Sequence, residues 1–228
     1  MRRFWIGPVR PVLLALLITA CSAHSPAHRP KAAPSPPAHA TAVNPANIKR
    51  VVSDLPPNYE ATSGIPSGAS PRVIWGLDSD ATSKPTPCAA LADPGNGRDQ
   101  SAQGVSASGP GGIINAVVVA LPDPVDLDQN IVDACGQWTM SAERTKASVR
   151  LSDPPHIDGA ETLGMVVDTK SSVESGTEID SRTYTFIAYL GSYYAFTTLT
   201  TDPGSAQPTL PAQFAADLLV KTVSTLRS

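Results

Sequence analysis

The sequence predicts an α+β domain with a mainly antiparallel sheet of about six to seven strands, helices packed on one face of that sheet, and one disulfide. Strand-like segments come in two runs, and helical patterns lie before, between and after these runs. This order favours antiparallel pairing with helices segregated from the strands. The chain also has three cysteines, of which two are expected in the folded part.

The N-terminal residues have the pattern of a secretory signal. Arg2 and Arg3 precede the apolar run "PVLLALLITA", and no acidic residue occurs before Cys21. A positive start followed by a short apolar run is typical of exported proteins. The run has about half of the ~20 residues that a membrane-spanning helix needs. We therefore expect residues 1–20 to be a signal peptide that is removed.

The end of this signal suggests a lipid anchor. The segment "LITAC" (17–21) resembles the bacterial lipobox, in which the cysteine is diacylated and becomes the new N-terminus. This predicts lipidation (palmitate) of Cys21 and attachment to the extracytoplasmic face of the cell membrane. The alternative is an ordinary cleavage site followed by an incidental cysteine.

Residues 21–46 are expected to form a tether. Residues 22–46 contain six prolines and no acidic or aromatic residue, so they cannot bury enough apolar surface to fold. His24, His28 and His39 could bind a metal weakly, but their irregular spacing favours solvated linker residues.

Residues 47–228 are expected to form one extracytoplasmic domain. They hold 12 Lys and Arg residues and all 20 Asp and Glu residues, which leaves a formal charge of −8. Such a surface argues against nucleic acid as a partner and against broad docking on anionic lipid. Membrane association is therefore assigned to the anchor.

The cysteine count predicts the disulfide. If Cys21 is acylated, only Cys88 and Cys135 remain in the exported domain. An even pair in an oxidising compartment is typical of a disulfide. The chain-entropy estimate for its stabilising effect is roughly 4 kcal/mol.

The first half of the domain begins with a short amphipathic helix over 44–55, for which Asn44 is the expected N-cap and Pro45 the first helical residue. Residues 70–77 are expected to form a strand and residues 88–92 one helical turn. Two strands follow, at 103–109 and at 113–121; the second, "IINAVVVAL", is expected near the sheet centre with both faces buried.

The segment after this strand predicts a helix that starts near Asp123. Leu127, Ile131, Cys135 and Trp138 follow at spacings of four, four and three. This spacing would place Cys135 on the apolar stripe of the helix, beside Trp138.

The last part of the chain predicts four strands and a final helix. Gly191 and Ser192 would turn the third of these strands into the fourth. The final helix begins near Pro211 and has Phe214 and Leu218 on one face. The four strands are expected at 146–152, 162–172, 178–190 and 193–201.

The sequence shows no catalytic constellation. His156 is the single histidine beyond the tether; Asp158 could orient it, and Ser106 or Ser108 could act as nucleophile. The G-x-S-x-G pattern is absent, because "GVSASG" spaces its glycines by five. A turn histidine is the favoured interpretation, and a hydrolase using His156 with a nearby serine or carboxylate is the alternative.

No metal or cofactor is predicted. The segment 126–137 lacks the glycine that a calcium loop needs at its sixth position and ends in Gln137. Acidic residues near a helix start more simply offset the helix dipole, and Cys88 and Cys135 form no C-x-x-C pair. Six aromatic residues could wall a ligand pocket but are more typical of sheet packing: Tyr184, Phe186, Tyr189, Tyr193, Tyr194 and Phe196.

Several segments together resemble a known family. They are "DLPPNYE" (54–60), "VIWGLDSD" with "PCAALADP" (73–94), "SASGPGG" (106–112) and "CGQWTMSAERTKASVRL" (135–151). They are similar to mycobacterial lipoproteins of unknown function, which are distantly similar to the extracellular sensor domain of PknH-type receptor kinases.

The resemblance implies a disulfide-bonded α+β domain with a candidate ligand cleft, outside the cytoplasmic membrane. The kinase sensor domains carry two disulfides, whereas this chain can form only one after lipidation, so no binding residue is carried over.

The leading hypothesis is a lipid-anchored cell-envelope lipoprotein with a non-enzymatic binding or sensor-like domain. Its expected partners are the membrane, through the anchor, and an unknown envelope ligand or protein. The alternatives are the hydrolase that uses His156 and a structural envelope scaffold.

Overall fold

The computed structural model describes residues 42–64, 70–173, 176–201 and 206–228. All of them belong to one compact unit, residues 39–228. The predicted signal peptide, Cys21 and the three histidines of the tether lie outside the described residues, so these assignments stay predictions. Within the described ranges, no helix is both long enough and apolar enough to cross a membrane.

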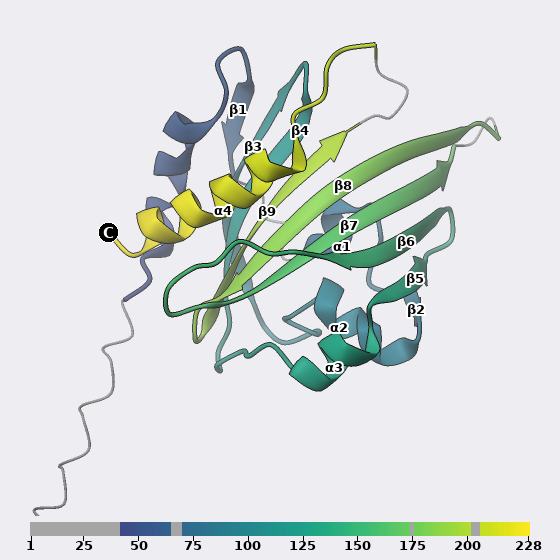
Figure 1. Ribbon diagram of the computed structural model, residues 1–228, viewed down its shortest axis with the longest axis horizontal. Helices are drawn as coiled ribbons and strands as arrows, with labels where there is room; N and C mark the ends of the chain where they lie inside the picture. Colours follow the sequence, from purple (N-terminus) through teal and green to yellow (C-terminus); the bar gives the residue numbers. More distant parts are fainter. Residues whose placement is uncertain (1–41, 65–69, 174–175, 202–205) are drawn as a thin grey trace, which may run out of the picture. The chain divides into compact units, whose positions relative to one another are not determined.

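The fold is built on one antiparallel sheet of nine strands (Figure 1). Their order across the sheet is β1-β3-β4-β9-β8-β7-β6-β5-β2, and every neighbouring pair is antiparallel. The strands are β1 (Glu60–Ser63), β2 (Thr82–Lys84), β3 (Ser101–Gly109), β4 (Gly112–Ala120), β5 (Gln137–Ser141), β6 (Thr145–Ser152), β7 (Glu161–Ser172), β8 (Glu178–Tyr189) and β9 (Tyr193–Thr201).

The six long strands β3, β4 and β6–β9 confirm the prediction to within two residues. The prediction of β4 as a strand buried on both faces is also correct, although β4 is third in the sheet and β8 is central. The expected number of strands is too low, because β1, β2 and β5 have only three to five residues each. All four residues of β1 are exposed, so β1 has no apolar alternation to mark it.

The helices lie on both faces of the sheet, and the prediction that they share one face is wrong. The reason is visible in β4, where Ile114 and Val118 point to one apolar cluster while Val117 and Val119 point to another. A sheet that is apolar on both sides needs cover on both sides. The helices are η1 (Pro45–Asp54), α1 (Pro71–Ile74), η2 (Thr86–Cys88), α2 (Ala89–Ala92), α3 (Gln129–Ala134) and α4 (Ala212–Leu226).

We name the two faces by what covers them. The α4 face packs against η1 and α4, whose Ile48, Val51 and Leu219 are buried with Leu199 of the sheet. The disulfide face packs against α1, η2, α2 and the residues around α3, with Trp75 and Leu91 among its buried side chains. The sheet is therefore the middle layer of three.

The strand predicted at 70–77 is a short helix followed by a turn. Pro71 occupies the first turn of α1, and the chain reverses at Gly76, whose φ is +76°. Trp75 and Leu77 are nevertheless buried, and Trp75 Nε1 donates a hydrogen bond to Thr185 Oγ1 at 3.0 Å. Their apolar character thus reflects packing on the disulfide face and not strand pairing.

The helix predicted from Asp123 to Trp138 is much shorter. α3 ends at Ala134, Cys135 is its C-cap, and Trp138 belongs to β5. Cys135 therefore does not lie on the stripe of a continuous helix. The apolar spacing arises because side chains from a loop, a helix end and a strand all face the same core.

The predicted disulfide between Cys88 and Cys135 is present, with an S–S distance of 2.03 Å. Both residues are buried. The bond joins η2, which follows β2, to the residue at the end of α3 just before β5. It thus fixes the segments next to the two outermost strands on this side of the sheet.

The two ends of the described domain meet. Asn44 caps η1 as predicted, because its side chain accepts a hydrogen bond from Ala46 N at 3.1 Å. Asn44 N also donates to Leu226 O at 2.8 Å, and Asn47 Nδ2 donates to Ser228 O at 2.9 Å. The first helix and the end of α4 therefore support each other.

Candidate ligand groove on the sheet

α4 covers only part of its face of the sheet. It contacts β4, β8 and β9, and Figure 1 shows β5, β6 and β2 extending away from it. The strands β8 and β7 have 12 residues each, so one end of each continues beyond the helix. This uncovered half is where the structure places its candidate site.

A groove of about 590 Å³ lies on the uncovered half. Its size is in the range of small-molecule sites. Most of the lining residues point to the α4 face and are polar, and we call the surface they form the polar groove. They are Thr82, Lys84, Thr139, Ser141, Lys146, Ser148, Asp168, Lys170, Asp180 and Arg182.

The strand register arranges these ten residues in two rows, since residues directly opposite each other on paired strands share a face. One row crosses five strands through Thr82, Ser141, Lys146, Lys170 and Asp180. The second row, two residues along each strand, reads Lys84, Thr139, Ser148, Asp168 and Arg182.

Ion pairs organise one side of the polar groove. Asp168 accepts from Arg182 Nε at 2.6 Å and from Arg150 Nη1 at 3.2 Å. Partial burial opposes its ionisation, but these two guanidinium groups outweigh burial and lower the pKa of Asp168. Lys170 Nζ lies 2.9 Å from Asp180 Oδ1, and this hydrogen bond raises the pKa of Lys170.

The polar groove carries more positive than negative charge. It holds four cations and two carboxylates, and Arg150 adds a fifth cation beside them. The resulting charge of +3 contrasts with −8 for the chain from residue 47 onward. Among the described residues, no carboxylate lies within ion-pair distance of Lys84 or Lys146.

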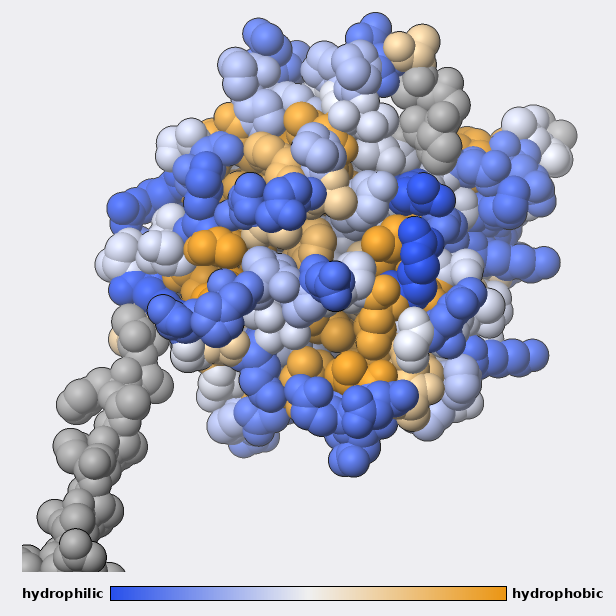
Figure 2. Space-filling model, viewed as in Figure 1, coloured by the Kyte–Doolittle hydropathy of each residue, from blue (hydrophilic) through white to orange (hydrophobic). Residues whose placement is uncertain are grey.

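A pocket of about 300 Å³ adjoins the polar groove on the side of α4. We call it the apolar pocket because most of its lining is apolar, although Ser152, Asp153 and Gln213 also line it. Val166 and Tyr184 line it and are the next row after Asp168 and Arg182. Phe186 follows one row later, opposite Gly164. Figure 2, in the view of Figure 1, shows hydrophobic and strongly hydrophilic residues side by side on this part of the surface.

Gly164 is required at the apolar pocket. A Cβ added there would come within 2.6 Å of Ser152 O and 3.2 Å of Phe186 Cε1. Any larger residue would therefore push β6 from β7 or displace the Phe186 ring. The floor of the pocket depends on this close approach.

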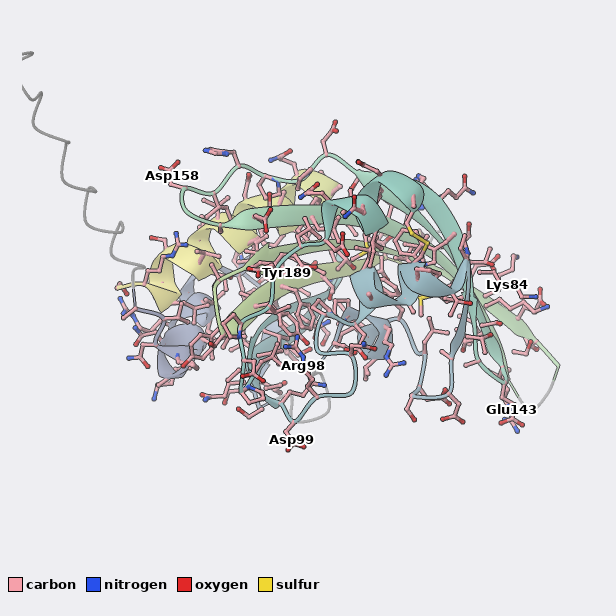
Figure 3. The ribbon with its side chains drawn as sticks, turned by 90° about the horizontal axis from the view of Figure 1, so that it is seen from below. Lys84, Arg98, Asp99, Glu143, Asp158 and Tyr189 are labelled. Atoms are coloured by element: carbon pink, nitrogen blue, oxygen red, sulfur yellow. A yellow bond between two sulfur atoms is a disulfide. The ribbon has the colours of Figure 1, made fainter. Side chains whose placement is uncertain are left out.

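His156 is not part of the polar groove. Its Nε2 lies 3.1 Å from Asp158 Oδ1, and the two side chains are 90% and 101% exposed. Figure 3 shows Asp158 and Lys84 on opposite sides of the described domain. The two residues of the alternative hydrolase hypothesis are thus together, but in an open loop.

Neither predicted serine nucleophile accompanies His156. A shallow groove of about 520 Å³ beside it is lined by Ser224 and Ser228 and not by Ser106 or Ser108, which lie in β3 at the far side of the sheet. Arg227 Nη1 and Nη2 donate to the carbonyls of residues 158 and 159 at 2.7 and 2.9 Å. These contacts fit a turn histidine that α4 holds in place.

One acidic residue near α3 has a structural role. Asp128, and not the predicted Asp123, is the N-cap, because its carboxylate accepts from Asn130 N at 2.9 Å and Ile131 N at 3.4 Å. In the part of the chain that the structure describes, no group of three or more His, Cys, Asp or Glu residues is placed to hold a metal.

The aromatic residues of β8 and β9 are divided between the two faces. Tyr189, Tyr194 and Phe196 are buried on the disulfide face, which is sheet packing. Tyr184 and Phe186 line the apolar pocket on the α4 face. Only these two of the six candidate residues therefore contribute to a possible ligand site.

Sequence reasoning did not identify the polar groove. A signal was present, because Lys146, Ser148 and Arg150 alternate with Ala147 and Val149 in β6. Such alternation indicates a strand with one face open to solvent. What the sequence could not give is the register, which sets these residues beside those of β2, β5, β7 and β8.

Two solved structures are similar to this chain. An uncharacterised protein from Mycobacterium smegmatis, the Rv0999 ortholog, has a solved structure with a TM-score of 0.62 and 18% identity, over 83% of this chain and 100% of that chain. The extracellular domain of PknH from Mycobacterium tuberculosis matches with a TM-score of 0.38 and 14% identity, over 81% of this chain and 93% of that chain.

No curated protein matches the chain. The first of these two structures shows a shared fold. The model of the family described as "Domain of unknown function (DUF5642)" matches residues 44–227. This match spans the whole described domain, and the chain belongs to that family.

Proposed function

We propose that this chain is a lipid-anchored, non-enzymatic binding or sensor-like domain on the extracytoplasmic face of the cell membrane, and that it holds its ligand in the polar groove. The observation that carries the proposal is the groove itself. Five strands present alternate polar side chains on a half of the sheet that no described helix covers. A surface ordered by strand pairing is already formed before a ligand arrives.

The proposed location rests on three features. The N-terminus has the pattern of an export signal, "LITAC" resembles a lipobox, and the domain contains the Cys88–Cys135 disulfide. Structural disulfides form and persist in oxidising compartments outside the cytoplasm.

The non-enzymatic role is supported by the chemistry of the polar groove. Its lining offers hydroxyl groups and lysines but no histidine, so a serine there has no imidazole to accept its proton. Asp168 is held by two arginines with a lowered pKa, which makes it a poor general base at neutral pH. The groove is thus suited to holding a molecule and not to transforming one.

Filling the groove tests this function. Ser148 lies in the middle of the second row, and Ser148→Trp would occupy the space without touching the core. We expect native mass spectrometry of the chain purified from membranes to show a bound species that the variant lacks. Ser108→Trp, on the exposed part of β3, is the matched control and should keep the bound species.

The same bound species in the chain and in Ser148→Trp would show that the polar groove is not the site.

The anchor is tested separately. Cys21→Ala should move the chain from the detergent phase to the aqueous phase in a detergent partition assay, and unchanged partitioning would refute lipidation at this cysteine.

A further inference from the structure

We infer that the polar groove and the apolar pocket beside it form one site for an anionic amphiphile, with an acidic head group on the lysines and an apolar chain directed toward α4. The inference rests on the proposed function, because it names the class of ligand that the polar groove takes. Three features of the described residues support it.

The first feature is an unbalanced pair of lysines. Lys146 and Lys170 lie directly opposite each other on β6 and β7, and like charges in this position repel. Asp180 compensates Lys170 from the other side, but no described carboxylate lies within ion-pair distance of Lys146. Lys84 also lines the groove, in the second row and on β2. An acidic group bound beside Lys146 would supply this lysine with a counter-charge.

The second feature is the set of groups around these lysines. Hydroxyl groups from β2, β5 and β6 line the same groove, and Thr82 Oγ1 lies 3.2 Å from Ser141 Oγ. Hydroxyl and ammonium groups together are suitable donors for a phosphate or carboxylate. Both arginines are engaged by Asp168. Lys170 is engaged by Asp180, so Lys146 and Lys84 are the cations available to a ligand.

The third feature is the direct continuation into apolar surface. Lys170, Asp168 and Val166 follow each other on the same face of β7, and Lys170 lies roughly 13 Å from Val166 at strand spacing. Tyr184 joins the two parts, since it lies close enough to Arg182 to contribute, after Asp168, to raising the pKa of that guanidinium. Beyond it, the apolar pocket is closed by Phe186 and by Ala212 and Ala216 of α4.

These features distinguish an amphiphile from simpler ligands. A small anion would use the lysine end and leave the apolar pocket empty. A neutral lipid would use the apolar pocket and leave Lys146 without a counter-charge. Only a molecule with both parts occupies the whole surface.

Three probes test the inference on the full chain with Cys21→Ala, which removes the predicted acylation site. They are dodecyl phosphate below its micelle concentration, inorganic phosphate, and dodecyl maltoside, with binding measured by calorimetry. We expect dodecyl phosphate to bind at least about tenfold more tightly than either of the others, a difference of ~1.4 kcal/mol. Equal affinity for phosphate and dodecyl phosphate would show that the apolar pocket takes no part.

Two sets of variants locate the two ends of the ligand. Lys146→Thr with Lys170→Thr should lower the affinity for dodecyl phosphate about tenfold or more, whereas Lys49→Thr with Lys221→Thr, the same charge change outside the groove, should leave it unchanged. Ala212→Trp should fill the apolar pocket, so that dodecyl phosphate binds no better than phosphate.

The outcomes separate this inference from the proposed function. If dodecyl maltoside binds as tightly as dodecyl phosphate, and the lysine variants change neither affinity while Ser148→Trp abolishes both, the groove binds ligands but the anionic class is wrong. If Ser148→Trp leaves dodecyl phosphate binding intact, the polar groove itself is not the site and both proposals fail.

Discussion

The α4 face of the sheet has two halves that are made by the same strands and differ in what covers them. In β8, Phe186 and Ala188 lie under or beside α4 and are buried, whereas Asp180 and Arg182 on the same face lie in the polar groove. The strand is continuous, so its conformation does not explain the difference. The difference follows from α4: the side chains of β8 that lie under or beside this helix are apolar, and those beyond it are charged.

The strands of the open half are stabilised by packing on the opposite side of the sheet, the disulfide face. Met165, Val167, Val149 and Met140 from β5–β7 are buried on the disulfide face. The covered half is thus stabilised from both sides and the open half from one. This difference predicts how mutations on the sheet divide between stability and binding.

The largest effect should come from the base of the open half. Cys88→Ser with Cys135→Ser should lower the free energy of unfolding by roughly 4 kcal/mol on the chain-entropy estimate, measured by urea denaturation. Hydrogen exchange should accelerate first in β2 and β5, because the bond joins the segments next to these two strands. Equal acceleration in every strand would contradict a local role, and Cys21→Ala should change neither quantity.

Within the covered half, the interface with α4 should carry most of the stability. Leu219 is fully buried, and Leu219→Ala should cost about 2–5 kcal/mol because it leaves a cavity. Val220→Ala is the matched control, since Val220 is the next residue on the same helix but 39% exposed. A loss below about 1 kcal/mol at Leu219 would mean that α4 covers its half only loosely.

The ion pairs of the open half should give a small, pH-dependent effect. The folded state lowers the pKa of Asp168, so its pairing stabilises the fold above the unfolded pKa of about 3.9 and is lost as the pH falls through the lower folded value. The side chain is 41% exposed, which limits the effect of Asp168→Asn to less than about 1 kcal/mol at neutral pH. The check is urea denaturation at several pH values between 2 and 7, where the variant should show a flatter dependence.

The smallest effect on stability should come from Lys146→Thr. Because this change removes the repulsion from Lys170 across β6 and β7, the free energy of unfolding should stay within about 0.5 kcal/mol of the original or rise slightly. A loss of more than about 1 kcal/mol would show that Lys146 has a structural role. In that case the two halves would not differ in the way described.

The six long strands and α4 were predictable because their apolar periodicity agrees with their conformation. The strand predicted at 70–77 and the helix predicted from Asp123 to Trp138 are wrong for one reason. In both segments, residues of different local structure place their side chains in the same core. Trp75, Leu77, Cys135 and Trp138 all point into the core of the disulfide face, and their spacing mimics a strand in one segment and a helix in the other. Only the tertiary arrangement distinguishes such mimicry from real periodicity.

The candidate site was less predictable than the fold. The polar groove takes its residues from five strands that span residues 82 to 182, and β2 and β5 were not predicted at all. The net charge of the domain gave no sign of the polar groove, because acidic residues elsewhere outnumber the basic residues that line it. The disulfide, in contrast, followed from the cysteine count once Cys21 was assigned to lipidation.

The junction between η1 and the end of α4 has a mechanical consequence. A pulling force applied at the N-terminal end of the described domain would act first on the hydrogen bonds from Asn44 to Leu226 and from Asn47 to Ser228. η1 and α4 would pass that load to β3, β4, β8 and β9, whereas β2 and β5 touch neither helix closely enough to share it. The domain could therefore be held under tension at this end while the strands at the outer side of the polar groove keep their register.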